Sequence, residues 1–481
     1  MRILHAIMIV MHLSSISMEG PLYAASSSIE YTFSDYEGTS AFTLEECTSI
    51  IVTENASKDG RPILMKNRDS SETNNVPTYI PATNTTYAYA AVNSMWMGIN
   101  EKGLAVMNTA MPYLSDMPSP GSFNGLLNRR ILKYCENVSD LKHKLDMKSS
   151  LLYSDAGFGG VSIATCVGVV DRDGRGAFFE ISDIGYSMEE VVDGYQSRAN
   201  HPRTYPGLAS GPNGRDEYAL EALDEIYEEK GIISWEDVAQ RVSRYVNKKE
   251  STMTGFTIGG EICNDNTVSA MVAVSGDVRY EGKLNIMWCE YGLVPIVGVF
   301  LPSMVYGGTP PSVLQEMVNY TQEKVEYAHG VYEDIYIASR VREIQNYSFT
   351  AENYAAKQYN RLIEQVPLGL SDDDLSSTLR DYIDLTVSVC ADMYVNETSQ
   401  MPDYAVNFNV TAEPSATYTS TPSTITDTST SNTSGTITQS TDYPTIPEAG
   451  DYSELLRPVI GFSSGIVPMI VLIAYLNRKW K

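Results

Sequence analysis

The strand-like segments of this chain come in pairs joined by short turns, and this pattern limits what the chain can fold into. Residues 47–53 and a segment ending at Asp69 flank residues 55–60, which have the composition of a tight turn. Residues 164–170 and 176–181 flank a second such turn. Strands paired in this way are antiparallel neighbours, so the sequence predicts sheets built from hairpins rather than from single β–α–β crossovers.

Helical patterns separate the groups of strands along the 481 residues. A hydrophobic content of 43% is enough to form a sizeable core. Periodicity alone establishes only a mixture of helices and strands. The order of the segments favours an α+β fold in which antiparallel sheets stack and are covered by helices, a four-layer αββα body. The predicted helical ranges are 122–147, 215–229, 234–246 and most of 312–398.

Both ends of the chain differ from this body in composition. Residues 1–24 have the pattern of a secretory signal peptide, and 25–46 form a polar, acidic leader. In 411–447, 20 of 37 residues are Ser or Thr and none is Lys or Arg, which predicts an unfolded stalk. Residues 458–476 form a stretch of 19 uncharged residues, close to the length of a membrane-spanning helix, and a basic cluster follows. A buried helix or a cleaved lipid-anchor signal is the alternative for this stretch.

The charge of the chain excludes some classes of partner. Acidic residues outnumber basic ones by 60 to 34, and the net charge is −26. Such a surface repels nucleic acid and anionic lipid, so neither is an expected partner. The six cysteines and five histidines show no spacing typical of a metal site, so we expect neither a metal nor a cofactor. One or two disulfide bonds fit the cysteine count, but the pairing and the oligomeric state stay open.

Cys47 begins the first strand-like segment, and Lys66, Arg68 and Asp69 return beside it at the end of the next. A thiol beside a cation and a carboxylate is a candidate nucleophile, whereas the three charges alone fit a solvated strand edge. If the chain is cut before Cys47, its own α-amine can accept the thiol proton, because the ordinary pKa values of about 7.7–8.0 and about 8.5 are close. On an ideal strand Lys66 and Arg68 share one face and Asp69 points to the other, so a bulge or a strand end is needed to resolve the conflict.

Four segments of the chain stand out together: Cys47-Thr48-Ser49, Lys66-Asn67-Arg68-Asp69, residues 98–104 (Gly-Ile-Asn-Glu-Lys-Gly-Leu) and residues 198–202 (Arg-Ala-Asn-His-Pro). In this order they resemble motifs of the linear-amide hydrolase branch of the N-terminal nucleophile superfamily. The chain looks like the penicillin acyltransferase-like group of that branch, which is related to choloylglycine hydrolases and penicillin V acylases. The resemblance covers residues 47–302, and its most specific motif is Gly-Ile-Asn-Glu-Lys-Gly-Leu.

The resemblance implies an αββα fold and a mechanism. The Glu46–Cys47 bond is cleaved by the chain itself, and the thiol of Cys47 then attacks a linear amide to form a thioester. Water resolves the thioester in a hydrolase, and a second amine or thiol resolves it in an acyltransferase. Asp69 is expected to orient the new amine, and Asn200 is expected to donate to the oxyanion.

The chain departs from the pattern of the related hydrolases at three places. Lys66 stands where they carry an arginine, so Lys66 or Arg68 is expected to supply the cation beside the thiol. Their second oxyanion donor falls on Ala110, so a backbone N–H or Asn108 is expected to take its place. Their late arginine has no clear partner, and Asn264 lies in about the right region.

The sequence therefore predicts an exported, membrane-tethered enzyme that cleaves a linear amide of a small acyl-amine substrate outside the cell. Acyl transfer and a cysteine dipeptidase activity are the enzymatic alternatives, and a surface or adhesion protein on an inactive hydrolase scaffold is the non-enzymatic one. The predicted parts are a signal peptide (1–24), a propeptide or leader (25–46), a catalytic domain (47–305), a helical extension packed on it (306–410), a stalk (411–457), a transmembrane helix (458–476) and a cytoplasmic basic tail (477–481).

Overall fold

The computed structural model describes most of the chain between Cys47 and Pro402. The predicted signal peptide, leader, stalk, membrane span and basic tail lie outside the described residues. Among the helices of this part of the chain, none combines the length and the apolar composition needed to cross a membrane. The described residues are 47–73, 75–92, 95–111, 114, 121–152, 163–182, 185–212, 214–246, 261–277, 280–330 and 335–402.

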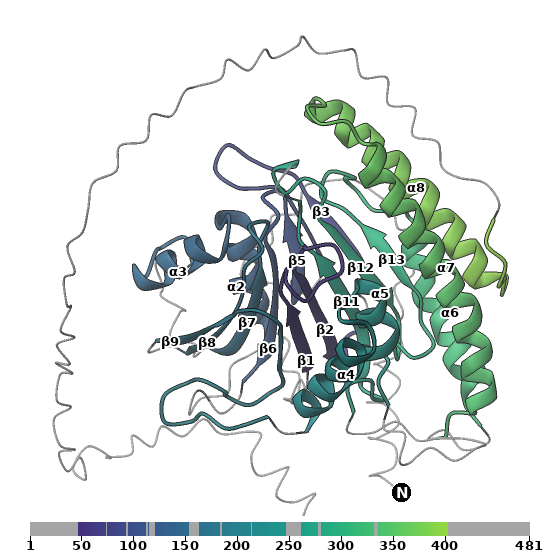
Figure 1. Cartoon of the computed structure of the whole chain (residues 1–481), viewed down its shortest axis with the longest axis horizontal. Coiled ribbons are helices and arrows are strands. Elements are labelled where there is room, and N and C mark those ends of the chain that lie inside the picture. Colours follow the sequence, from purple (N-terminus) through teal and green to yellow (C-terminus); the bar gives the residue numbers. More distant parts are fainter. Residues whose placement is uncertain are drawn as a thin grey trace, which may run out of the picture. The chain divides into compact units, whose positions relative to one another are not determined.

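Two antiparallel sheets form the centre of the fold (Figure 1). Both predicted hairpins are present, because β1 pairs with β2 and β7 pairs with β8. The first sheet has the order β10 (Tyr195–Arg198), β1 (Cys47–Val52), β2 (Ile63–Asp69), β11 (Thr267–Val274), β12 (Ile286–Tyr291) and β13 (Phe300–Ser303). The second sheet follows the chain, with β3 (Pro77–Ile80), β4 (Tyr89–Val92), β5 (Met97–Asn100), β6 (Ala105–Ala110), β7 (Ala164–Val170), β8 (Gly176–Ser182) and β9 (Tyr186–Val191).

Helices cover the outer face of each sheet. The second sheet is covered by α2 (Gly121–Tyr134) and α3 (Val138–Asp146), which the sequence predicted as one helix. They are separate because Asn137 caps α3 by accepting a hydrogen bond from the amide of Asp140. The predicted α+β sandwich of antiparallel sheets is thus confirmed. The first sheet is covered by α4 (Arg215–Lys230), α5 (Trp235–Asp237), the π-helical turn η3 (Val238–Val242), α6 (Val313–Ala328), α7 (Ala338–Gln365) and α8 (Asp372–Val395).

The two sheets approach closely at a glycine in the middle of β7. A Cβ atom on Gly168 would lie 2.3 Å from Cε of Met107 and 3.3 Å from Cδ1 of Leu64 on β2. The inner face of the first sheet is therefore packed against the second sheet, and its outer face against helices. Because both faces are covered, β1, β2, β11 and β12 contain buried residues only, and their sequences show no clear alternation of apolar and polar residues.

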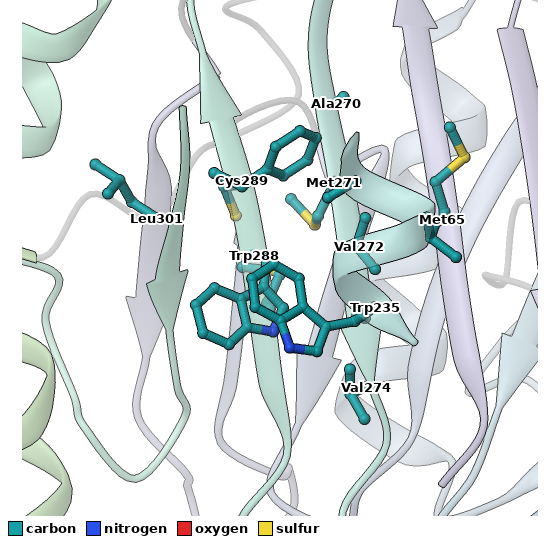
Figure 2. Packing of buried hydrophobic residues seen from close by; sticks show 14 of the residues in the cluster. Met65, Trp235, Ala270, Met271, Val272, Val274, Trp288, Cys289 and Leu301 are labelled. Carbon is teal, nitrogen blue, oxygen red and sulfur yellow. The ribbon is translucent and has the colours of Figure 1, made fainter. Parts of the chain in front are cut away.

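The helical layer packs on the first sheet through large aromatic side chains (Figure 2). Trp235 of α5 stacks on Trp288 of β12, with ring centroids 3.7 Å apart and an interplanar angle of 4°. Tyr359 of α7 meets Trp288 edge-on at 5.9 Å. The helices of the C-terminal extension thus continue the layer that α4 and α5 begin.

Candidate active site

Cys47 is the first residue of β1 and lies opposite Arg68 of β2. Two residues further along the strand, Oγ of Ser49 lies 3.2 Å from Oγ1 of Thr109 on β6, so Ser49 points toward the second sheet. Alternation along the strand places the side chain of Cys47 on the same inner face. The residue is fully buried.

The backbone nitrogen of Cys47 donates a hydrogen bond of 2.7 Å to Oδ1 of Asn200. Asn200 follows β10, the strand that flanks β1 on its other side. Its Nδ2 donates to the carbonyl oxygen of Ala110, the last residue of β6, at 2.8 Å. Asn200 was predicted to donate to an oxyanion. In this geometry its side chain joins the nitrogen of Cys47 to the end of the second sheet, and the role of oxyanion donor stays a prediction.

Asp69 is the last residue of β2 and is 3% exposed. Its Oδ1 accepts a hydrogen bond from Oγ1 of Thr267 at 2.7 Å. Its Oδ2 accepts one from Nδ2 of Asn264 at 2.8 Å and one from Nη1 of Arg215 at 3.2 Å. Donors on both oxygens, one of them cationic, suit an ionised carboxylate.

The strand end does not bring Asp69 to the face of Lys66 and Arg68, so the alternation expected from the sequence holds. The pairing of β2 with β11 shifts between Thr267 and Ser269, next to Asp69. The side chain of Asp69 points away from the inner face, toward Arg215 at the start of α4. Asp69 therefore reaches the region of Cys47 by way of Arg215 and Asn200.

Arg215 is a functional candidate that the sequence analysis missed. Its Nη2 donates to Oδ1 of Asn200 at 2.8 Å, while Nη1 binds Asp69, so one guanidinium joins the two residues. The same oxygen of Asn200 accepts from Cys47. A signal was present in the sequence, because Arg215 is the first residue of a helix, where a cation opposes the helix dipole.

The two predicted cations lie on the inner face of β2 at different distances from the thiol. Arg68 is directly opposite Cys47, whereas Lys66 is opposite Ser49, two pairs further along the ladder. Nη1 of Arg68 donates to Oδ1 of Asn75 at 2.8 Å, and Nζ of Lys66 donates to the carbonyl oxygen of Asn108. Arg68 is therefore the better placed of the two to favour a thiolate at Cys47.

Both cations also lie over the ring of Trp96. The distances to the ring centroid are 5.0 Å for Nζ of Lys66 and 5.7 Å for the guanidinium carbon of Arg68. Nε1 of Trp96 donates to Oδ1 of Asn75 at 2.9 Å, the oxygen that also binds Arg68. The indole thus fixes the orientation of the cations on the inner face.

Asn108, a predicted oxyanion donor, points away from Cys47. Its neighbour Thr109 faces the first sheet, so alternation directs the side chain of Asn108 to the outer face of the second sheet. There its Oδ1 accepts a hydrogen bond of 3.0 Å from Nδ2 of Asn128 on α2. The structure therefore does not bring the side chain of Asn108 to the nucleophile. Its backbone contacts the site, because its carbonyl oxygen accepts from Lys66 and its amide donates to the carbonyl oxygen of Trp96 at 3.1 Å.

The other five cysteines are buried and form no disulfide bond within the described residues. Burial raises the pKa of Cys135 to about 12 and raises those of the remaining four still further. They stay protonated near neutral pH and are poor nucleophiles. In the same part of the chain, no cluster of His, Cys, Asp and Glu side chains could hold a metal ion. The four are Cys166, Cys263, Cys289 and Cys390.

Comparison with known protein families adds to this geometry. The sequence pattern of the acyl-coenzyme A:6-aminopenicillanic acid acyl-transferase family matches residues 55–254. The predicted resemblance to this family is confirmed. The matched region contains Asp69, Asn200 and Arg215, and it begins after Cys47. The family fits an enzyme that hydrolyses an amide or transfers an acyl group.

Solved structures with detectable similarity include two variants of conjugated bile acid hydrolase from Clostridium perfringens and penicillin V acylase from Agrobacterium tumefaciens. The first variant is 15% identical with a TM-score of 0.24, and the match covers 37% of this chain and 57% of that chain. The second is 13% identical with a TM-score of 0.33, covering 51% and 89%. The acylase is 11% identical with a TM-score of 0.28, covering 53% and 86%. No curated protein matches the chain.

Proposed function

We propose that this chain is an N-terminal nucleophile enzyme that cleaves a linear acyl-amide substrate with Cys47. The observation that carries the proposal is the contact between the backbone nitrogen of Cys47 and Asn200, within a cluster that also contains Arg215 and Asp69. A backbone nitrogen held by a side chain and linked to a buried ion pair is what a nucleophile with its own amine as base requires.

In the proposed first step the thiol of Cys47 attacks the carbonyl carbon of Glu46. The acyl group moves from nitrogen to sulfur, and water then hydrolyses the resulting thioester. The products are a carboxylate at Glu46 and a free α-amine at Cys47. Asn200 keeps this nitrogen in place throughout, because its Oδ1 accepts from the amide before cleavage and can accept from the amine afterwards.

In the mature enzyme the amine takes the proton from the thiol of Cys47 while the sulfur attacks the substrate carbonyl. The leaving amine of the substrate then takes that proton, and water hydrolyses the thioester. Arg215 places a positive charge near the amine, which favours its neutral, proton-accepting form, and Asp69 balances that charge. Arg68, opposite the thiol, favours the thiolate.

Hydrolysis is our first choice of reaction, and acyl transfer is the second. Acyl transfer has the support of the family match, but an acyl-coenzyme A donor is scarce outside a cell. A cysteine dipeptidase activity uses the same nucleophile on a different amide. A surface or adhesion role on an inactive scaffold agrees less well with an intact Cys47 whose nitrogen is held by Asn200.

The proposed location is the outer face of a cell, where residues 458–476 would anchor the chain. It is supported by composition only, through the uncharged stretch and the basic residues after it. Alkaline carbonate extraction of membranes from cells expressing the full chain tests the anchor. The full chain should stay with the membranes, and a chain ending at residue 457 should be released. Release of both would disprove the anchor.

The mechanism is tested by the N-terminus of the purified protein. N-terminal sequencing should find Cys47 as the first residue of the wild type, and Cys47→Ala should retain the peptide bond to Glu46. Cys289→Ala, which removes a buried thiol of β12, is the matched control and should be processed normally. A wild-type chain that begins upstream of Cys47 would disprove self-activation. A Cys47→Ala chain that hydrolyses acyl-amines such as penicillin V would disprove the nucleophile.

A further inference from the structure

We propose that helices α7 and α8 of the C-terminal extension position Asp69 through the connection between β12 and β13. Residues 294–298 of that connection are called the bridging segment below. The inference rests on the proposed function in one respect, namely that Asp69 serves the chemistry of Cys47. It assigns to the extension a part in the active site, in addition to covering the first sheet.

The two helices hold the bridging segment by its backbone oxygens. Tyr394, a fully buried residue of α8, donates from its hydroxyl to the carbonyl oxygen of Val297 at 2.8 Å. Gln345 of α7 donates from Nε2 to the carbonyl oxygen of Ile296 at 3.1 Å. Buried carbonyl groups without donors are costly, so these bonds constrain the path of the segment.

A buried ion pair fixes the segment at two further points. Arg244, which follows η3, donates from Nε to the carbonyl oxygen of Pro295 at 2.8 Å and from Nη2 to that of Gly298 at 2.9 Å. The same guanidinium binds Glu352 of α7 at 2.5 Å and 3.3 Å. Both charged side chains are buried, so the position of Arg244 depends on the carboxylate that α7 supplies.

The other end of the bridging segment contacts a residue that binds Asp69. The amide nitrogen of Val294 donates to the carbonyl oxygen of Thr267 at 2.8 Å. Thr267 in turn donates from Oγ1 to Asp69. Val294 has a φ angle of 59°, a left-handed conformation that is costly for a β-branched residue and persists only where the surroundings enforce it.

The sheet alone does not fix the position of Thr267 fully. It is the first residue of β11, at the position where the pairing with β2 shifts register. A residue inside a regular ladder is held on both sides, whereas one at an irregular strand end is held less firmly. Asn264 holds the amide and the hydroxyl of Thr267, at 2.9 Å and 3.0 Å. The bridging segment adds a hydrogen bond to the carbonyl oxygen of Thr267, and α7 and α8 hold the bridging segment.

The inference is tested with Tyr394→Phe in the full chain, which removes only the hydroxyl that binds Val297. Tyr382→Phe is the matched control, because Tyr382 is also a buried tyrosine of α8 but donates to Ala355 within the extension. Two quantities are measured. One is the rate at which purified precursor is cleaved before Cys47, followed by intact mass and called release of Cys47 below. The other is hydrogen–deuterium exchange of the peptide 264–270.

Tyr394→Phe is expected to slow the release of Cys47 by about fivefold and to raise exchange in the peptide, since one buried hydrogen bond is lost. Tyr382→Phe should leave both quantities at their wild-type values. Glu352→Gln tests the link from α7 and should slow release by about tenfold or more, because Arg244 loses its counter-charge.

A double-mutant cycle separates positioning from a general loss of stability. In a chain that already carries Thr267→Val, Tyr394→Phe should have almost no further effect on release, since the link is already cut. Additive effects, or equal effects of Tyr394→Phe and Tyr382→Phe on exchange, would overturn the inference. If the wild type does not release Cys47 while exchange still rises in Tyr394→Phe alone, the link stands and the proposed function fails.

Discussion

Two carboxyl groups of the first sheet, Asp69 and Glu290, are both buried but differ in their partners. Asp69 accepts hydrogen bonds from Thr267, Asn264 and Arg215. Glu290, on β12, has no well-formed hydrogen bond to either carboxylate oxygen from the described residues. Within the described part of the chain, the fold therefore places hydrogen-bond donors around Asp69 but not around Glu290.

The environment of Glu290 keeps it neutral. Burial raises the pKa of Glu290 to about 8, and repulsion from Glu352 adds to this. Arg244 and the backbone of Ala270 offset only part of the shift, because Arg244 is already engaged by Glu352. The comparison teaches that burial alone favours the protonated, neutral form of a carboxyl group. A buried carboxyl group stays ionised only where hydrogen-bond donors surround it.

The largest expected effect comes from removing the charge that the donors surround. In Asp69→Asn the side chain keeps its shape but cannot balance Arg215, and its NH₂ group meets donors instead of acceptors. Release of Cys47 should fall by about a thousandfold or more, the scale found when a carboxylate that orients a catalytic group becomes an amide. Intact mass of the precursor over time measures this. Glu290→Gln, the same change at the other carboxyl group, should leave release unchanged, and an equal loss in both variants would contradict the distinction.

Arg215 is the next test of the same cluster. Arg215→Met leaves Asp69 without a cation and Asn200 with one donor fewer, so release of Cys47 should slow by about a hundredfold, equivalent to about 2.7 kcal/mol. Arg215→Lys restores the charge but cannot reach both residues with a planar fork, so it should recover only about tenfold of that loss. The same release assay measures both variants. If Arg215→Met is processed at the wild-type rate, the bridge between Asp69 and Asn200 plays no part.

For Glu290 the expected effect is on stability and depends on pH. The unfolded chain loses the Glu290 proton above about pH 4.5, whereas the folded protein keeps it up to about pH 8. The free energy of unfolding therefore falls as pH rises from about 4.5 to about 8, by up to about 1.4 kcal/mol per pH unit. Above about pH 8 the loss of stability does not grow further. Glu290→Gln removes the penalty, so it should stabilise the protein by a few kcal/mol at about pH 9 and have little effect at about pH 4. Urea unfolding at the two pH values measures the difference. A stabilisation of equal size at both would show that Glu290 is not kept neutral by burial.

Whether a contact of the fold or of the site could be predicted from the sequence depends on whether residues close together in the chain determine it. The hairpin that puts Arg68 opposite Cys47 is local, because turn-forming residues and two short strands determine it. The resemblance to family motifs singled out Asp69 and Asn200, which the structure links through Arg215, but it did not show that Asn200 would bind the nitrogen of Cys47. The second sheet could be predicted in part for the same reason, since its strands follow the order of the chain. The pairing of β6 with β7 is not local, because α2 and α3 lie between these strands in the chain.

The contacts that could not be predicted are those that tertiary packing creates. Arg215 reaches Asp69 from 146 residues away, and no periodicity reports such a pairing. The side chain of Asn108 turns to the outer face because of the alternation within β6, and a shift of one residue would have turned it inward. The lack of hydrogen-bond donors at Glu290 could not be predicted from the sequence either, because a lone glutamate near the end of a strand usually lies in solvent.

The smallest expected effect tests how far the donor set of Asp69 is shared. Asn264 and Arg215 both bind Oδ2, at 2.8 Å and 3.2 Å, whereas Thr267 binds Oδ1. Asn264→Ala therefore leaves Oδ2 with the stronger, cationic donor, and release of Cys47 should slow by only about tenfold or less, in line with about 1 kcal/mol for one such bond. Combined with Arg215→Met, the same change should cost more than the sum of the two, because Oδ2 then has neither donor and Asp69 approaches the condition of Glu290. A strictly additive double variant in the release assay would mean that the two donors act on Asp69 independently, and that losing them does not turn a charged carboxylate into a neutral buried acid.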